Sequence, residues 1–223
     1  MAARKKLLVV TGATGFVGRH FVERILEEQG IEIRCLVRPG SDTSALAAMG
    51  NRVSFVDGDI TRPESLKPAF ADAWAVVNLA GYREFWSRHR DHFYEVNERG
   101  ASNVFHACLD AGVQKVVQVS TPLAYGAPTR IPFDEDTPPG EHASDYARSK
   151  YLGDEAGWHL HRREGLPLTT VYLAAVIGAG DDKSTMEVKR AVQKNLPALV
   201  GADTTYTYLY VRDAAEAIAR ALL

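Results

Sequence analysis

The stretch TGATGFVG, from Thr11 to Gly18, directly follows an apolar run at Leu7–Val10. A short apolar run before a glycine-rich turn predicts a buried strand, and the residues behind the turn predict a helix over Phe16–Glu28 that Gly30 stops. The N-terminus of such a helix offers free backbone N–H groups and a positive dipole end, which together bind phosphate groups. The stretch therefore predicts a strand, a turn and a helix that bind the pyrophosphate of a dinucleotide.

The three glycines of this turn have different expected roles. Gly12 permits the tight turn, Gly15 lets the backbone approach a pyrophosphate, and Gly18 allows the helix to pack closely on its strand. Glycines also close ordinary strand-to-helix turns, so the motif alone is weak evidence. The residues of the stretch that we expect to contact the cofactor are Gly12, Thr14, Gly15, Phe16, Val17 and Gly18.

The composition is that of a soluble globular protein, with 46% hydrophobic and 24% charged residues among 223. A net charge of −2 gives no electrostatic reason to expect nucleic acid or an anionic membrane as a partner. The apolar run at Leu7–Val10 is too short for a signal peptide, and no later stretch approaches a transmembrane span. Cys35 and Cys108 lie in apolar surroundings, which predicts reduced core residues and a reducing compartment, the cytoplasm. No cluster of histidine and cysteine has zinc spacing, so we expect no metal site.

Strands and helices alternate along almost the whole chain. The predicted strands are Leu7–Thr11, Glu32–Val37, Arg52–Val56, Ala75–Leu79, Lys115–Ser120 and Leu168–Leu173. The predicted helices after the first are a short one that Pro63 starts, His92–Ala111 and Tyr146–Arg163. This alternation predicts an α/β fold of the Rossmann type, a doubly wound parallel sheet with helices on both faces, in a single domain over residues 1–223.

Two stretches interrupt this alternation. Gly126–Asp145 is rich in proline, glycine and acidic residues and predicts a long surface loop, and a loop of that length in a compact domain is more often functional than not. Thr204–Val211 alternates, with three tyrosines on one face, and predicts a late strand. A capping pattern that begins at Asp213 predicts a final helix that runs to Leu223.

Tyr146 and Lys150 are four residues apart and therefore lie one turn apart on one face of the predicted helix. The pKa of a free phenol is ~10, which makes tyrosine a poor acid or base at neutral pH. A nearby ammonium favours the phenolate, so we expect Lys150 to lower this pKa towards the working range. Such pairs also occur on ordinary exposed helix faces, but this one follows a glycine-rich turn and the run Val119-Ser120-Thr121, which favours a catalytic role.

These motifs together resemble the extended short-chain dehydrogenase/reductase family, which combines a TGxxGxxG turn, a Ser or Thr at the end of the fifth strand and YxxxK. The chain is most similar to the dihydroflavonol-reductase-like and sugar-epimerase-like branch. Segments that have a similar form in that branch are Leu36–Asp42, Gly58–Ile60, Val96–Gly100, Ala111–Val116 and Tyr210–Asp213. The resemblance spans nearly the whole chain and is specific for fold and cofactor class, but not for substrate.

The resemblance implies a role for each matching residue. Tyr146 would be the general acid/base for the substrate oxygen, and Lys150 would hold the nicotinamide ribose and lower the pKa of Tyr146. Thr121 would be the catalytic hydroxyl that orients the carbonyl, with Ser120 as its neighbour beside the cofactor. The further cofactor contacts that the resemblance implies are Asp59 and Ile60 beside the adenine, the backbone of Leu79, Ala80 and Gly81, and Asn97. Asp59 could equally be an ordinary turn residue, and Asn97 an ordinary residue on a helix surface.

Arg38 follows the second predicted strand, where an NAD enzyme usually has an acidic residue that accepts from the ribose 2′-hydroxyl. A guanidinium instead suits a 2′-phosphate, through charge-assisted and often bidentate hydrogen bonds. We therefore expect NADP(H) to be preferred and NAD(H) to be the alternative cofactor. The other interpretation is that Arg38 stacks on the adenine and accepts either cofactor.

Two features depart from the family pattern. After the sixth predicted strand, Tyr172-Leu173 stands where the family typically has Arg-Pro, ahead of the second glycine turn at Gly178–Gly180. Relatives also usually continue well beyond the segment at Tyr210–Asp213, whereas this chain stops at Leu223. The substrate lobe, with elements around residues 178–210, is then either small or truncated.

The sequence leaves three functions open. The first is an NADP(H)-dependent oxidoreductase that transfers a hydride between the nicotinamide and a small-molecule carbonyl or secondary alcohol. The second is a nucleotide-sugar epimerase or dehydratase, which uses the same residues and keeps its cofactor through the cycle. The third is a non-catalytic NAD(P)-binding subunit on the same fold.

Aromatic and apolar residues supply the last two expectations. Tyr82, Phe85 and Trp86 form either an apolar wall for a planar carbonyl substrate or part of the core. Family members often dimerise through the two helices predicted over His92–Ala111 and Tyr146–Arg163, so we expect a homodimer. The apolar candidates for that surface, each of which would also fit the core, are Phe93, Val96, Val104 and Leu152.

Overall fold

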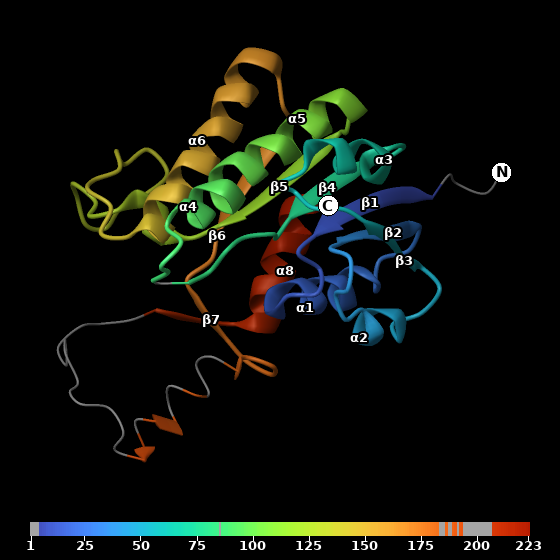
Figure 1. The fold of residues 1–223 in the computed structure, drawn as a ribbon, viewed down its shortest axis with the longest axis horizontal. Helices are drawn as coiled ribbons and strands as arrows, with labels where there is room; N and C mark the ends of the chain where they lie inside the picture. The colour runs from blue at the N-terminus through green and yellow to red at the C-terminus, as the bar shows by residue number, and fades with distance from the viewer. Residues whose placement is uncertain (1–4, 85, 183–185, 187–188, 191, 194–206) are drawn as a thin grey trace.

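Six parallel strands form one sheet in the computed structural model, which describes residues 5–84, 86–182, 186, 189–190, 192–193 and 207–223 (Figure 1). The strands are β1 (Lys6–Thr11), β2 (Ile31–Val37), β3 (Val53–Asp57), β4 (Ala75–Asn78), β5 (Lys115–Ser120) and β6 (Leu168–Tyr172). Their order across the sheet is β3-β2-β1-β4-β5-β6, and every neighbouring pair is parallel. This is the strand order of the doubly wound dinucleotide-binding fold, so the predicted fold class is confirmed.

Helices cover both faces of this sheet (Figure 1). One face carries α1 (Phe16–Ile25), α2 (Ser44–Ala47) and α8 (Val211–Leu222). The other face carries α3 (Leu66–Phe70), which follows the 3-10 turn η1 (Pro63–Ser65), together with α5 (Ala101–Ala111) and α6 (Asp145–Glu164). The short helix expected from Pro63 is therefore present as η1 and α3.

The central strands send alternate side chains into two separate cores. Leu8 and Val10 of β1 are fully buried in the core that includes α1 and α8. Val9, between them, is fully buried in the core that includes α3, α5 and α6. Because both faces are covered, the strand is a continuous apolar run rather than an alternating one, which is why it was readable from the sequence.

The helix predicted over His92–Ala111 has three parts. α4 (Asp91–Tyr94) leads into a π-helical segment, η2 (Glu95–Gly100), which continues as α5. The prediction of one regular helix was wrong in this middle turn, because a π turn holds one more residue than an α turn and the apolar period does not reveal it. Here η2 packs so closely on α6 that a Cβ at Gly153 would lie 2.2 Å from the carbonyl oxygen of Asn97.

A second sheet of two parallel strands lies beyond β6. It pairs β7 (Ala175–Ile177) with β8 (Tyr208–Tyr210). The late strand predicted over Thr204–Val211 ends one residue earlier than expected, at Tyr210. The fully buried Val211 is instead the first residue of α8, which begins two residues before its expected start at Asp213. Residues 204–206 of that prediction lie outside the described residues.

The thiols of Cys35 and Cys108 are both buried and not disulfide-bonded, as predicted for core residues. Burial raises the pKa of both thiols, that of Cys35 to about 12. Among the described residues, no helix has the length and apolar character that a bilayer span requires. In the same part of the chain, no three His, Cys, Asp or Glu side chains are grouped as metal ligands would be.

Candidate active site

The glycine-rich turn lies between the carboxyl ends of β1 and β4, where the strand order reverses and ligands bind in folds of this kind. Gly12 has a φ of 68°, and a Cβ there would lie 2.6 Å from the backbone nitrogen of Ala80. Thr11 Oγ1 accepts a hydrogen bond of 3.2 Å from the same Ala80 N–H. The turn and the segment Leu79–Gly81 are therefore in direct contact, as their shared predicted role requires.

The N-terminus of α1 has room for an anion. Its N-cap is Gly15, which offers no capping side chain, and both Thr14 and Gly15 are exposed at the tip of the turn. A Cβ at Gly18 would lie 2.2 Å from the carbonyl oxygen of Gly12, so only a glycine allows this close packing of helix and turn. The turn fits a pyrophosphate at the helix N-terminus, bound by backbone N–H groups and by the dipole.

Tyr146 and Thr121 come together at the carboxyl end of β5. Tyr146 lies in the first turn of α6, and Thr121 caps the 3-10 helix η3 (Pro122–Tyr125) that follows the strand. The Thr121 hydroxyl lies close enough to the Tyr146 phenol to oppose the rise in pKa that burial causes there. Burial raises the pKa of the Tyr146 phenol, and the Arg83 guanidinium opposes that rise. The net shift is upward, opposite to the one that we expected from Lys150.

Lys150 lies one turn further along α6, and only 6% of the residue is exposed. Its Nζ donates a hydrogen bond of 2.9 Å to the carbonyl oxygen of Val119, the last residue but one of β5. Burial lowers the pKa of this ammonium, and the Asp154 carboxylate opposes the fall. The predicted trio of Thr121, Tyr146 and Lys150 is therefore assembled where β5 meets α6.

The first turn of α6 is held by contacts that the sequence analysis missed. Ser144 caps the helix by accepting a hydrogen bond of 3.1 Å from the N–H of Ala147. Asp145 accepts two hydrogen bonds from Arg90, at 2.6 and 2.9 Å, and one of 2.8 Å from the Tyr94 hydroxyl. The Arg90 guanidinium holds the pKa of that carboxyl below its usual range. A serine before a predicted helix could have indicated the cap, but no local pattern indicates a partner 55 residues away.

Asn97, a predicted cofactor contact, is buried in η2 with its side chain hydrogen-bonded to protein groups. Its amide is bonded to the main chain of Tyr82 on the segment after β4, and it donates 3.0 Å to Ser149 Oγ on α6. The observed role of Asn97 is to hold the segment after β4 beside α6. Contact with a cofactor stays a prediction.

Other predicted cofactor contacts have different surroundings. Arg38 is exposed directly after the last residue of β2. The carboxylate of Asp59 accepts hydrogen bonds of 2.9 Å from both the N–H and the hydroxyl of Thr61, so it forms the turn that was its alternative interpretation. Ile60 beside it is buried, with 6% exposed, and packs in the core that includes α5.

Ser120 is buried at the end of β5 and donates a hydrogen bond to Asp154 on α6. Burial raises the pKa of Asp154 to about 6, and the Lys150 ammonium opposes the rise. Sequence analysis missed Asp154, although a signal was present. It lies four residues after Lys150, and therefore on the same face of the helix as Tyr146 and Lys150.

The loop predicted over Gly126–Asp145 lines a cavity of about 370 Å³ beside α6. Aromatic side chains from three elements form much of its wall, namely Tyr125, Tyr151, Trp158 and Tyr172. The polar lining includes Asp154, so the cavity reaches the carboxylate that contacts Ser120. The cavity thus adjoins the Lys150 end of the site.

Curated proteins similar to this chain include a dehydrogenase and a reductase by name. A 3beta-hydroxysteroid-dehydrogenase/decarboxylase of Arabidopsis thaliana is 26% identical, over 94% of this chain and 51% of its own length. A putative dihydroflavonol 4-reductase of Synechocystis sp. is 27% identical, over 92% of this chain and 60% of its own length. The chain therefore spans between half and two thirds of the length of these curated relatives.

The fold has close counterparts among solved structures. The dTDP-glucose 4,6-dehydratase of Streptomyces venezuelae, solved with NAD bound, matches with a TM-score of 0.82 and 26% identity, over 97% of this chain and 71% of that one. The model of the NAD dependent epimerase/dehydratase family matches residues 8–223, from β1 to the end of α8. This chain belongs to the NAD dependent epimerase/dehydratase family.

Proposed function

We propose that the protein transfers a hydride between a nicotinamide cofactor and a carbonyl or secondary alcohol. The observation that carries the proposal is the closeness of the Thr121 and Tyr146 hydroxyl groups, at the same edge of the sheet as the uncapped N-terminus of α1. Two hydroxyl groups so arranged hold the oxygen of a carbonyl and pass a proton to it. The nicotinamide, when bound, supplies or accepts the hydride.

Each side chain of the trio has its own task in this proposal. Thr121 donates a hydrogen bond to the substrate oxygen and orients it. Tyr146 gives a proton to that oxygen during reduction and removes it during oxidation. Lys150 holds the ribose of the cofactor and, by its charge, stabilises the phenolate that Tyr146 becomes. The glycine-rich turn from Gly12 to Gly18 holds the pyrophosphate.

The substitution Tyr146→Phe tests this function. Turnover of a panel of aldehydes, ketones and secondary alcohols should fall by a factor of about 10²–10⁴ in Tyr146→Phe, the usual contribution of a general acid or base. The Kd of NADPH, measured by calorimetry, should change by less than about threefold, or less than ~0.7 kcal/mol. Unchanged turnover with tight cofactor binding would contradict the role of Tyr146.

We infer that NADP(H) is the preferred cofactor. The support is Arg38, which is exposed directly after β2, at the edge of the sheet that carries the glycine-rich turn. A guanidinium in that place pairs with a 2′-phosphate and has no acidic neighbour to accept from a free ribose hydroxyl until Asp42.

A nucleotide-sugar epimerase or dehydratase is the second candidate. It is favoured by the family description and by the likeness to a dTDP-glucose 4,6-dehydratase. The same Tyr146 and Lys150 would act, and the cofactor would return to its starting form in each cycle. Oxidised cofactor that co-purifies with the protein, together with conversion of a nucleotide sugar without net use of NADPH, would favour this function over the first.

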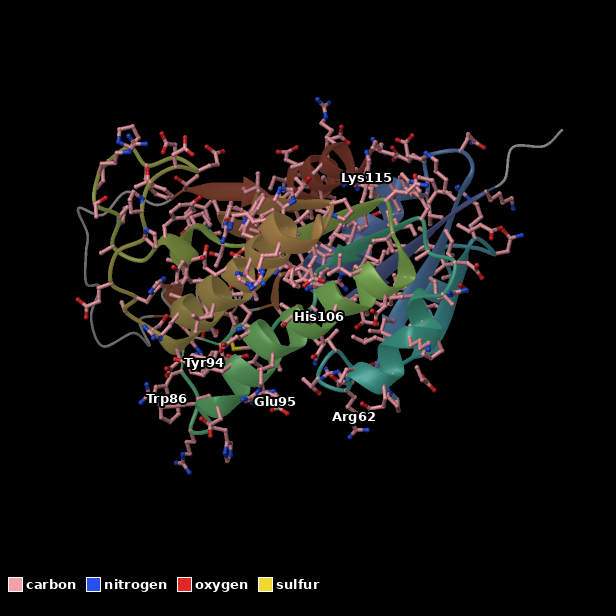
Figure 2. The ribbon with its side chains drawn as sticks, turned by 90° about the horizontal axis from the view of Figure 1, so that it is seen from above. Arg62, Trp86, Tyr94, Glu95, His106 and Lys115 are labelled. Carbon is pink, nitrogen blue, oxygen red and sulfur yellow. The ribbon has the colours of Figure 1, made fainter. Side chains whose placement is uncertain are left out.

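We propose an apolar or planar group beside the substrate carbonyl. Trp86 is 75% exposed, and Figure 2 shows it at the end of the molecule that also carries Tyr94. Tyr82 instead packs edge-on against the buried Phe93, with 4.9 Å between the ring centroids, so its ring supports α4. Phe85 lies outside the described residues. If Trp86 lines the substrate site, Trp86→Ala should raise KM for aromatic ketones more than for small aliphatic ones.

The homodimer also stays a proposal, with a smaller candidate surface. Phe93 and Val104 are buried within the chain, with 1% and 0% exposed, so they belong to the core and not to a dimer surface. Val96 on η2 and Leu152 on α6 are partly exposed and remain candidates. Light scattering at tens of micromolar, about the concentration at which such assemblies are usually examined, should show twice the mass of the chain. A monomer would overturn the proposal.

A further inference from the structure

A row of buried polar side chains crosses the sheet below the candidate active site. It begins at Thr11 on β1, whose Oγ1 donates a hydrogen bond of 2.5 Å to Asn78 Oδ1 on β4. Asn78 Nδ2 in turn donates 2.8 Å to Gln118 Oε1 on β5. All three residues are at most 1% exposed. Since unpaired buried polar groups are costly, these bonds fix the strand ends relative to one another.

The row ends at the carboxylate of Asp154 on α6. Gln118 Nε2 lies 3.5 Å from Asp154 Oδ1, and Ser120 Oγ donates to Asp154 Oδ2. Ser120 is the residue directly before Thr121, whose hydroxyl lies close to that of Tyr146. A carboxylate that accepts from the last residue of β5 therefore also fixes the start of the segment that carries the catalytic hydroxyl.

Asp154 and Lys150 are opposite charges buried one helical turn apart, with 3% and 6% exposed. The Lys150 ammonium donates to the Val119 carbonyl, and the Asp154 carboxylate accepts from Ser120. The hydrogen-bond partner of each charge is therefore a neutral group. Each charge opposes the effect of burial on the pKa of the other. A charge taken out of water in this way is tolerated only when a partner of opposite sign is present.

The other titratable groups around Asp154 do not supply that compensation. On α6 they are Glu155, an exposed carboxylate, and Tyr146. From η3 and β6 the groups near its charge are the phenols Tyr125 and Tyr172; burial raises the pKa of both, and the carboxylate adds to the rise. Among the described residues, Lys150 is the cation whose charge opposes the effect of burial on the pKa of Asp154, while Arg162 lines the same cavity as Asp154.

We propose that Asp154 is a positioning residue, which keeps the buried Lys150 protonated and holds Ser120 so that Thr121 faces Tyr146. This role rests on the proposed function, in which the charge of Lys150 holds the cofactor ribose and stabilises the Tyr146 phenolate. Asp154 itself does not touch the reacting atoms. It acts on them through Lys150 and through the end of β5.

The protonation of Lys150 is the direct test, and it needs neither substrate nor cofactor. Protein labelled with ¹³C at lysine Cε is titrated by NMR, and the Lys150 signal is assigned by its loss in Lys150→Arg. Asp154→Asn should lower the titration midpoint of Lys150 by about one pH unit or more, because the amide carries no compensating charge. Glu155→Gln is the matched control, and it should shift the midpoint by less than about 0.3 unit, since water screens that exposed carboxylate.

Equal midpoints in the unmutated protein and in Asp154→Asn would overturn the proposal. If Asp154→Asn does not fold, Lys150→Met gives the reciprocal measurement, since the coupling of two titrating groups acts equally in both directions. With ¹³C at the aspartate carboxyl, the midpoint of Asp154 should rise by a similar amount in Lys150→Met, and an unchanged midpoint would contradict the coupling. If the unmutated protein turned over no member of the panel, the proposed function would be removed but this charge coupling would remain intact, so the two failures are distinguishable.

Discussion

The side-chain amide of Asn97 forms two hydrogen bonds with the main chain of Tyr82, one to its N–H and one to its carbonyl group, as a residue of a paired antiparallel strand does. Its Oδ1 accepts from the Tyr82 N–H at 2.8 Å, and its Nδ2 donates to the Tyr82 carbonyl oxygen at 3.0 Å. The same Nδ2 also donates to Ser149 Oγ on α6. One side chain from the π-helical segment therefore ties the segment after β4 to the helix that carries Tyr146.

The first prediction follows from this pair. Asn97→Ala leaves the N–H and the carbonyl of Tyr82 without these partners, so the free energy of unfolding should fall by about 2–4 kcal/mol. Urea denaturation measures the change. Asn51→Ala removes an exposed asparagine in a turn and should stay within about 0.5 kcal/mol of the unmutated protein. Equal midpoints for the two variants would show that the Asn97 bonds add nothing to stability.

The second prediction concerns the glycine-rich turn. At Gly12 an added Cβ would lie 2.6 Å from the Ala80 nitrogen, whereas at Gly30, which also has a positive φ, it would meet nothing within 4 Å. Gly12→Ala should lower the free energy of unfolding by about 2 kcal/mol or more and weaken NADPH binding. Gly30→Ala has backbone strain alone, which costs about 1–2 kcal/mol, and should bind NADPH normally. Calorimetry measures the NADPH affinity of both variants. Equal affinities in Gly12→Ala and Gly30→Ala would contradict the role of the Gly12 turn in binding the cofactor.

The third prediction is a dependence of stability on pH. The pKa of Asp154 is about 6 in the folded protein, against 3.8 for a free aspartate, so the folded state binds this proton more tightly. Protonated Asp154 therefore stabilises the folded state fully below pH 4. As the pH rises through 6 the carboxyl ionises and the free energy of unfolding falls by roughly 3 kcal/mol. Asp154→Asn should remove this loss.

Urea denaturation at several pH values between 4 and 7 measures this difference. The free energy of unfolding of Asp154→Asn, relative to the unmutated protein, should increase steadily over that range. Glu155→Gln controls for the removal of a carboxylate, and its relative free energy should vary far less because that side chain is exposed. If the difference in the free energy of unfolding between Asp154→Asn and the unmutated protein does not change with pH, burial does not raise the pKa of Asp154.

The fourth prediction is cofactor preference. Charge-assisted hydrogen bonds contribute on the order of 1.5–3 kcal/mol, so Arg38→Ala should raise the Kd of NADPH roughly ten- to a hundredfold and leave that of NADH nearly unchanged. Arg38→Asp should go further, because it repels the phosphate and accepts from a free ribose hydroxyl. Calorimetry with both cofactors is the measurement. Equal affinities in the unmutated protein would leave Arg38 as a stacking or surface residue.

Local patterns were enough to predict the sheet and the trio at its edge. The apolar run before Thr11 is buried on both faces, and the four-residue spacing of Tyr146 and Lys150 places both on one helix face. These features depend on neighbours in the sequence, through strand burial and helix period. Asp154 follows Lys150 at the same four-residue interval, so the helix period could have indicated it as well.

Contacts between distant segments could not be predicted in this way. Arg90 and Asp145 are 55 residues apart, and Asn97 meets Tyr82 through a π turn that the apolar period does not reveal. The expected fall in the pKa of Tyr146 was also wrong, because burial raises it and a sequence does not show how deeply a side chain is buried. Partner choice and desolvation are properties of the folded chain.

The position of α8 has a consequence for how the protein is made. Ile218 and Leu222 of α8 are fully buried in the same core as Leu8 of β1, and Lys115 Nζ, labelled in Figure 2, donates 2.7 Å to the Leu222 carbonyl. A ribosome adds about 5–20 residues per second, so the apolar face of β1 and α1 waits roughly 10–40 s for the helix that covers it. This face of β1 is therefore exposed to water until α8 has been synthesised, and a chaperone that binds nascent chains would recognise the apolar side chains there.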